Sequence, residues 1–307
     1  MTIGAVIIAD GKTTHGSILP ATTSVGSVSA VKRLIGTFHQ AGAEWIVVVT
    51  DQTSFANVEK HTARLGVLCL CNEEQTDCEM IDFAKIGLQY LQDKCDAVLL
   101  TPVNNPLFTA RTIHKLLQSE AKIASPVYKN KSGHPLLIAS DAIPSILQYQ
   151  GDDGLRGAIK NSPYDRSFVT VTDAGILCNI ASSSNYHGLL EDFKQQSFHP
   201  SIKVRLVKEQ PFFGPGAAQL LTYIRDTGSV RLACQQMGIS YSKAWKIIDV
   251  MEQQTGNKMV ERQQGGKNGG KAYLTAQGVC LLNKFNQFER ACKKFTQHAF
   301  EEIFKTD

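Results

Sequence analysis

The sequence predicts an α/β fold: a doubly wound, Rossmann-like domain with a parallel sheet, followed by a smaller, mainly helical domain. The first observation is a series of short apolar runs without polar alternation, at 5–10, 45–50, 67–71, 97–102 and 122–128. The second is that amphipathic stretches separate these runs, at 29–42, 81–92 and 110–120. Strands that are apolar on both faces and alternate with helices are typical of a parallel sheet covered by helices on both sides.

This alternation stops between residues 186 and 216, where Pro200, Pro211 and Pro215 occur. We predict a boundary near 196–202 and assign 1–198 to the first domain and 203–307 to the second. In the second domain, we expect a short strand, three short helices, a β-hairpin and a long closing helix. Their predicted ranges are 203–207, 217–228, 229–238, 240–256, 260–275 and 278–305.

The composition excludes several classes of protein. With 307 residues and 43% hydrophobic content, the chain can bury two sizeable cores. No run of about eighteen apolar residues and no basic-then-apolar leader is present, so we expect a soluble, cytoplasmic protein with no membrane partner. The eight cysteines form no CxxC pair, which predicts reduced thiols and no metal site.

The charge is unevenly distributed along the chain. Residues 201–307 hold 16 Lys and Arg against 9 Asp and Glu, a net charge of +7, whereas residues 1–200 hold 16 against 19, a net charge of −3. A basic second part favours contact with a polyanion, although a basic surface is often only a solvated face.

The three short helices have the spacing of a helix-turn-helix. Ser229 and Ser240 have the position of N-caps, and Gly238 that of a turn glycine. The third helix would enter a DNA major groove with its N-terminal half. Its opposite stripe, Trp245, Ile248 and Met251, is predicted to face the core. The predicted DNA-binding residues are Arg231, Ser240, Tyr241, Ser242, Lys243, Lys246, Arg262, Lys267 and Lys271.

The hairpin after these helices carries paired glycines and two lysines at its predicted tip, in the stretch GGKNGGK (265–271). Glycines let the backbone approach phosphates closely, and lysines supply positive charge, as the wing of a winged helix requires. The alternative is a flexible hairpin tip without function. Its position directly after a helix-turn-helix favours the wing.

The second domain resembles a known family in the stretch TGSV…MGISYSKAW…MVERQQGGKNGGKAYLT. It is similar, over about 203–295, to the N-terminal winged-helix domain of ModE-type molybdate-responsive regulators. This resemblance implies a dimeric regulator that binds double-stranded DNA. The family often has Lys-Ser where this chain has Ser242-Lys243. The two small molybdate-binding modules of full-length members are absent from this sequence.

The first domain resembles the MobA/MocA-like nucleotidyltransferases, which attach GMP or CMP to molybdopterin. GHPLLI (133–138) and GDDGLRGAI (151–159) are similar to family motifs, and the resemblance spans about 3–192. It implies a pocket for a nucleotide, pterin or oxyanion ligand. The residues predicted to line that pocket are Asp10, Gly11, Lys12, Asn72, Asn104, Gly133, His134 and Pro135.

The acidic positions of that family are changed in this chain. Its strand-end motif GDMPL, whose Asp holds the catalytic Mg²⁺, here reads Val103-Asn104-Asn105-Pro106-Leu107. A second acidic stretch is replaced by residues 179–185, with Asn179 and Ala181 at the lost positions. Because metal-borne charge neutralisation is central to phosphoryl transfer, we predict no catalytic residue and no cofactor here.

Three hypotheses about function follow. The first is a DNA-binding regulator whose first domain is a catalytically degenerate sensor or scaffold. The second is an active, Mg²⁺- and nucleotide-dependent molybdopterin nucleotidyltransferase that carries its own regulator. The third is a dimer whose first domain only binds partner proteins.

Overall fold

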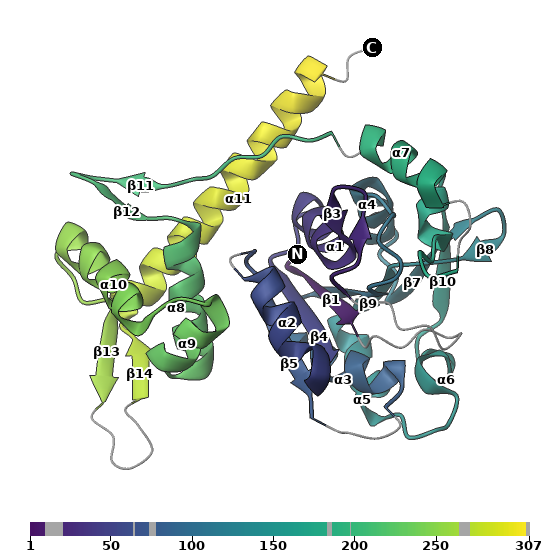
Figure 1. Cartoon of the computed structure of the whole chain (residues 1–307), viewed down its shortest axis with the longest axis horizontal. Helices are drawn as coiled ribbons and strands as arrows, with labels where there is room; N and C mark the ends of the chain where they lie inside the picture. The colour runs from purple at the N-terminus through teal and green to yellow at the C-terminus, as the bar shows by residue number, and fades with distance from the viewer. Residues whose placement is uncertain are drawn as a thin grey trace. The chain divides into compact units, whose positions relative to one another are not determined.

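The chain is described by a computed structural model that covers residues 1–9, 21–63, 65–73, 78–182, 186–196, 198–263 and 271–304. It divides into two compact units, Met1–Phe198 and His199–Asp307, which Figure 1 shows in purple to teal and in green to yellow.

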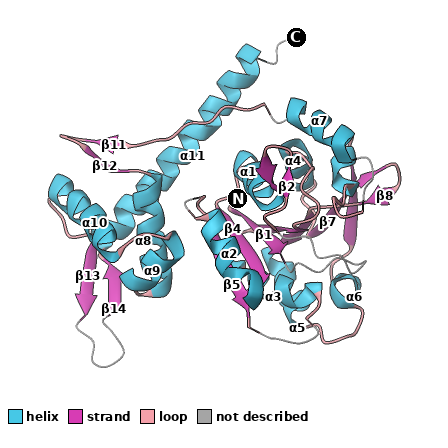
Figure 2. Ribbon diagram, viewed as in Figure 1, coloured by secondary structure: helices cyan, strands magenta, loops and turns pink. Residues whose placement is uncertain are grey.

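The first unit is built on one large sheet with the strand order β10-β7-β9-β6-β1-β4-β5 (Figure 2). The central strands β1, β4, β5 and β6 are parallel to one another. The strand β9 is antiparallel to both β6 and β7, and β10 is parallel to β7. The bounds are β1 Ile3–Ala9, β4 Trp45–Asp51, β5 Leu68–Asn72, β6 Ala97–Pro102, β7 Ile123–Tyr128, β9 Leu136–Ala139 and β10 Arg166–Thr170.

Helices cover both faces of this sheet, as predicted for a doubly wound fold. Alternate residues of β1 face opposite layers: Ala5 and Ile7 pack in one core, and Val6 and Ile8 pack in the other. Helices α1 (Ala30–Gln40), α2 (Gln52–Thr62), α4 (Ala110–Gln118) and α7 (Tyr186–Gln196) contribute to the first core. Helices α3 (Met80–Leu91), α5 (Ile143–Gln148) and α6 (Gly154–Lys160) contribute to the second.

One strand, β9, departs from the parallel direction that the sequence analysis expects for this sheet. The chain turns back directly after β7, through a tight turn in which Lys129 and Asn130 have positive φ angles of 48° and 63°. The short strand β8 (Lys131–Ser132) then pairs with β7, and β9 follows without a helical crossover. Parallel neighbours need such a crossover, so β9 runs antiparallel.

The second unit packs helices α8 (Pro215–Thr227), α9 (Val230–Met237) and α10 (Tyr241–Thr255) around a core centred on Leu220, Ile248 and Phe285. The predicted caps are present: Ser229 accepts a hydrogen bond from the Leu232 amide, and Ser240 accepts one from the Lys243 amide.

A two-stranded wing and a long helix complete this unit. The wing consists of β13 (Val260–Gln263) and β14 (Lys271–Leu274), and the helix is α11 (Ala276–Phe304). The predicted strand over 203–207 is reduced to β11 (Leu206–Val207), which pairs with β12 (Pro211–Phe213). Lys203 and Arg205 in this stretch are exposed, so they gain little from pairing. None of the helices in the described part of the chain combines the length and hydrophobicity that a membrane span needs.

Candidate functional sites

The first candidate site lies at the carboxyl ends of the parallel strands of the first unit. Strand β6 ends at Pro102, and Asn104 follows it. The amide of Ile180 donates a hydrogen bond of 2.9 Å to the Asn104 carbonyl oxygen. The side chain of Asn179 accepts a hydrogen bond of 2.9 Å from the Ala181 amide. The fold therefore brings together the three positions at which the sequence predicts lost acids.

The two adjacent asparagines after β6 have different environments. Asn105 is buried, and its side chain donates to the Cys178 carbonyl oxygen at 3.1 Å, so it fixes the neighbouring segment. The Asn104 Oδ1 atom is also buried, yet it has no hydrogen-bond partner among the described residues. A buried polar atom without a partner costs free energy, and a ligand that donates a hydrogen bond to it would remove this cost.

The loop of Gly133, His134 and Pro135 is held against the turn of residues 174–177. The His134 amide donates to the Ile176 carbonyl oxygen at 3.0 Å. A Cβ on Gly133 would lie 2.2 Å from that oxygen, so only glycine fits. Burial, together with the nearby Arg166 charge, lowers the pKa of His134 to about 4. The imidazole is therefore neutral at physiological pH, and its buried Nδ1 has no partner among the described residues.

Asp173 fixes the start of that turn. Its carboxylate accepts hydrogen bonds from the Thr109 amide, from the hydroxyls of Thr109 and Thr112, and from the Gly175 amide. Asp173 thus ties the N-terminus of α4 to the segment that carries Asn179 and supports the His134 loop. This bridge could not be predicted from the sequence, because Thr109 and Asp173 are 64 residues apart.

Two further polar residues end neighbouring strands. Asn72 closes β5 and is 4% exposed, and Asp51 closes β4 directly opposite it in register. Burial alone raises the pKa of Asp51, but hydrogen bonds from Thr53 and Ser54 outweigh this effect and hold the pKa below its ordinary value. The sequence analysis missed Asp51, although an acid directly after the run WIVVVT marks it. The predicted ligand residues Asp10, Gly11 and Lys12 lie outside the described residues.

In the part of the chain that the structure describes, no group of three or more His, Cys, Asp or Glu side chains is arranged to hold a metal ion. Among the described residues, the groups at this strand edge are neutral amides and a neutral imidazole, which can form hydrogen bonds, and the Asp51 carboxylate.

The second candidate site is the exposed face of α10 with the adjoining wing. The predicted residues Arg231, Ser240, Tyr241, Ser242, Lys243, Lys246, Arg262 and Lys271 are all exposed, and Lys267 lies outside the described residues. Asp249 and Gln253 continue the same exposed face of the helix, spaced at i+3 and i+7 from Lys246. The sequence analysis missed both, because it considered only the N-terminal half of the helix.

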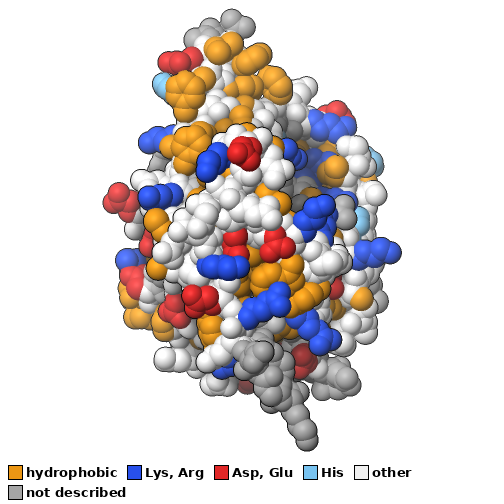
Figure 3. Space-filling model, turned by 90° about the vertical axis from the view of Figure 1, so that its left-hand side faces the viewer, with side chains coloured by type: hydrophobic (Ala, Val, Ile, Leu, Met, Phe, Trp, Pro, Cys, Tyr) orange, Lys and Arg blue, Asp and Glu red, His pale blue; other side chains and the backbone are white. Residues whose placement is uncertain are grey.

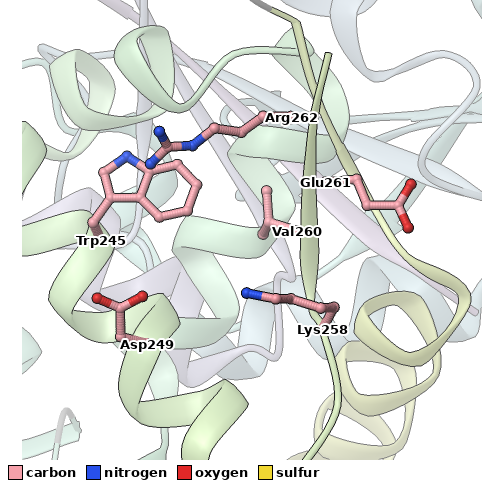
Figure 4. Close-up of a pocket in the computed structure, with 6 residues that line it drawn as sticks. All are labelled: Trp245, Asp249, Lys258, Val260, Glu261 and Arg262. Atoms are coloured by element: carbon pink, nitrogen blue, oxygen red, sulfur yellow. The ribbon is translucent and has the colours of Figure 1, made fainter. Parts of the chain in front are cut away.

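The prediction that Trp245 faces the core holds in part, because its side chain packs against the core of the second unit but is also partly exposed. Ile248 and Met251 are fully buried, but Trp245 is only partly buried. Its ring lies 3.4 Å from the guanidinium carbon of Arg262, and it is one wall of an open pocket of about 430 Å³. Figure 4 shows this pocket between α10 and β13. Trp245 lies at the edge of the apolar stripe, because it is rotated by about 100° around the helix axis from the buried Ala244. Its side chain therefore projects toward the wing.

The wing is fastened to α10 by Glu252. This carboxylate accepts hydrogen bonds from the Met259 amide at 2.8 Å and the Val260 amide at 3.4 Å, and it pairs with Lys258 at 2.6 Å. Burial alone raises the pKa of Glu252, but these hydrogen bonds and the Lys258 charge outweigh it and lower the pKa below 4.5.

We predict that Glu252→Gln destabilises the second unit by about 1–3 kcal/mol at neutral pH. The Gln oxygen can still accept from the buried amides, but these hydrogen bonds lose their charge assistance and the pair with Lys258 is lost. The stabilisation is fully present above the unfolded pKa of 4.5 and is lost as the pH falls through the lower folded value. Denaturant unfolding followed by Trp245 fluorescence, in a Trp45→Phe background, measures both effects. A difference between the two proteins that did not shrink toward about pH 3 would contradict this account.

Comparisons with known proteins agree with this division of the chain. Residues 20–167 match the MobA-like NTP transferase domain, and residues 216–279 match the bacterial regulatory helix-turn-helix protein family of the lysR type. In the search of solved structures, a Methanothermobacter nucleotidyl transferase matches with a TM-score of 0.52 and 16% identity, over 63% of this chain and 98% of that one. The protein Rv0371c of Mycobacterium tuberculosis matches with a TM-score of 0.50 and 15% identity, over 62% and 98%. At these identities, the likeness shows the fold alone.

The curated relatives match the second unit. The DNA-binding transcriptional dual regulator ModE of Escherichia coli K12 is 36% identical over 101 residues, which are 33% of this chain and 37% of the relative. The molybdenum-pterin-binding protein MopB of Rhodobacter capsulatus is 32% identical over 94 residues, 31% and 34% of the two chains. The match spans about a third of the length of these relatives. The chain therefore joins a domain that matches the MobA-like NTP transferase model to a helix-turn-helix domain, and about a third of the chain is similar to the ModE regulators.

Proposed function

We propose that this protein is a DNA-binding transcription regulator linked to molybdenum or molybdopterin metabolism, acting in the cytoplasm. The observation that carries the proposal is the second unit itself. It has a capped recognition helix with exposed Lys243 and Lys246, and Glu252 fixes the wing beside that helix. Exposed cationic groups on an ordered helix and wing are what a major groove and its phosphates bind. The regulators named ModE support the link to molybdenum.

The N-terminal unit is proposed to be a sensor that has lost nucleotidyl transfer. Asn104 and the segment of Asn179 and Ala181 supply only amide and methyl groups where a metal needs carboxylates. The unpartnered Asn104 Oδ1 and the neutral His134 leave a site that suits a hydrogen-bonding ligand, a nucleotide or a pterin, without a metal. Titration of the full chain with GTP, CTP or a pterin, with and without Mg²⁺, tests this. Affinity that depends strongly on Mg²⁺ would count against a metal-free sensor.

The second candidate function is an active nucleotidyltransferase fused to its regulator. The observation in its favour is Asp51, which is ionised at neutral pH and stands at the same strand edge, in register with Asn72. A carboxylate at this edge is a hard oxygen ligand of the kind that Mg²⁺ takes. Release of pyrophosphate from GTP or CTP in the presence of a molybdopterin acceptor distinguishes an enzyme from a sensor.

A homodimer is part of the proposal, and helix α11 is its expected interface. Beyond Phe285, which is buried in the core, Phe288 is 51% exposed, Phe295 is 73% exposed and Ile303 is 71% exposed. From Phe288 onward, residues 288, 292, 295 and 299 follow the alternating spacing of three and four that places side chains on one coiled-coil seam. Figure 3 shows hydrophobic side chains gathered at the top of the view, on the end of α11. The occupant that fits a heptad seam is the same helix of a second copy.

We predict that Phe288→Ser combined with Phe295→Ser weakens the dimer more than tenfold, because each change removes an aromatic ring that the dimer would bury. Sedimentation velocity over a range of concentrations measures the change. Lys293→Ser with Lys294→Ser, on the exposed side of the same helix, is the matched control and should leave the dimer intact. A monomeric unmodified protein would remove the dimer from the proposal.

A further inference from the structure

The stack of Arg262 on Trp245 joins two elements that a winged helix uses separately. Trp245 belongs to α10 and Arg262 belongs to β13. The guanidinium carbon lies 3.4 Å from the indole centroid, and Figure 4 shows the two planes face to face. Tyr241, one turn earlier on α10, meets the same indole edge-on, with ring centroids 6.1 Å apart and an interplanar angle of 65°. The exposed N-terminal turn of the helix is thus connected to the wing through one aromatic ring.

A carboxylate does not hold Arg262 in this place. Asp249 and Glu261 line the same pocket, yet no carboxylate of the described residues lies within ion-pair distance of the guanidinium. In Figure 4, Glu261 points away from Trp245 on the far side of the strand, and Lys258 extends toward Asp249. The ring is therefore the contact that orders Arg262, and the N–H donors in the guanidinium plane stay available to another group.

A stacked guanidinium is well suited to bind a nucleic acid. Its planar set of N–H donors matches a phosphate or the O6 and N7 acceptors of guanine in a bidentate manner. Ordering the side chain before binding lowers the entropy cost of each contact that it makes. The Trp245 ring stays half-buried in this arrangement, whereas the Ile248 side chain, about one turn farther along the helix, is fully buried in the core.

We propose that Trp245 is a positioning residue for DNA recognition, which holds Arg262 against α10 so that the recognition helix and the wing strand present one ordered set of donors. This inference rests on the proposed DNA binding of the second unit. It assigns Trp245 a role through Arg262 and no direct contact with the DNA.

The test is a double-mutant cycle in the full-length chain, with a promoter fragment near its own gene as the probe. Arg262→Ala and Trp245→Leu should each weaken binding by about threefold to thirtyfold, the range that a cation–π contact at a partly exposed site covers. The double variant should be no weaker than Arg262→Ala alone, because Trp245 has nothing left to position. Trp245→Phe should restore most of the affinity, because a ring remains for the guanidinium to stack on.

The control cycle pairs Trp245→Leu with Lys246→Ala. The Lys246 side chain is exposed, and Arg262 is the cation that stacks on the ring, so these two losses should add. In a Trp45→Phe background, Arg262→Ala should change the emission of Trp245, and circular dichroism monitors folding of every variant.

If the unmodified chain binds no DNA, the proposed function fails. If it binds DNA and the losses of Trp245→Leu and Arg262→Ala add, the proposed function stands and this inference is overturned. If Trp245→Leu does not fold, Trp245→Phe decides the question. If Trp245→Phe bound DNA as weakly as Arg262→Ala, the inference that Trp245 positions Arg262 would be overturned.

Discussion

Replacing Lys243 and Lys246 together by glutamate is expected to weaken DNA binding by the full-length chain at least about a hundredfold. Both lysines are exposed on the N-terminal half of α10, where Ser240 caps the helix. Each replacement removes a cation that neutralises a phosphate or reads a base edge, and adds an anion that repels the DNA backbone. Fluorescence anisotropy with a labelled duplex, at several salt concentrations, measures both the affinity and its salt dependence.

The salt dependence of binding measures how many phosphate contacts the two lysines make. Each phosphate contact contributes about 0.9 to the slope of log K against log salt, so two lost contacts should flatten the slope by about 2. The matched control is Lys203→Glu with Lys294→Glu, which changes the net charge of the chain equally but alters exposed residues outside α10 and the wing. Similar weakening by both pairs would mean that net charge, and not the helix face, governs binding. An unchanged slope in the Lys243 and Lys246 variant would place neither lysine on a phosphate.

Periodicity and caps predicted most of the fold because they are local signals. The strands at 45–50 and 97–102 and the helix at 81–92 were recognisable from apolar spacing alone, and Ser229 and Ser240 from capping chemistry. Strand β9 was not recognisable as antiparallel, because its direction depends on the turn at Lys129 and Asn130. Strand β10 was also not predicted, because its side chains are mostly exposed and its sequence contains no apolar run.

The candidate sites were harder to predict because they depend on contacts between distant segments. Asn104 was identified from its place after a strand, but nothing in the sequence indicates that the Ile180 amide contacts its carbonyl. The stripe of Trp245, Ile248 and Met251 follows helical spacing, yet spacing cannot tell a core residue from one at the edge of the stripe. Glu252 and Asp173 bind amides that become their neighbours only after folding. Local patterns thus indicate which residues carry chemistry, and the tertiary fold decides which of them meet.

The unmodified chain is expected to release no pyrophosphate from GTP or CTP with any molybdopterin acceptor, at any Mg²⁺ concentration. A metal ion contributes several kcal/mol of transition-state stabilisation in such chemistry, so its loss costs at least about a thousandfold in rate. In this chain, the Ile180 amide donates a hydrogen bond to the Asn104 carbonyl oxygen, so Ala181, the next residue, belongs to a segment that lies beside Asn104.

Restoring both acids, by Asn104→Asp with Ala181→Asp, is the sharpest test of this account. Asn104 Oδ1 is buried, so two carboxylates placed there would repel each other unless a cation neutralised them. Mg²⁺ should therefore raise the melting temperature of the restored variant and leave that of the unmodified chain unchanged, because a ligand that binds only the folded state stabilises it. Asn105→Asp is the matched control: it adds one carboxylate beside Asn104 and removes the donor to the Cys178 carbonyl oxygen. This change should lower the melting temperature, and Mg²⁺ should not raise it again. Pyrophosphate release by the unmodified chain would overturn the loss of catalysis and favour the fused enzyme. A response to Mg²⁺ confined to the restored variant would instead trace the loss to these two positions, and leave the first unit with a ligand site that works by hydrogen bonds alone.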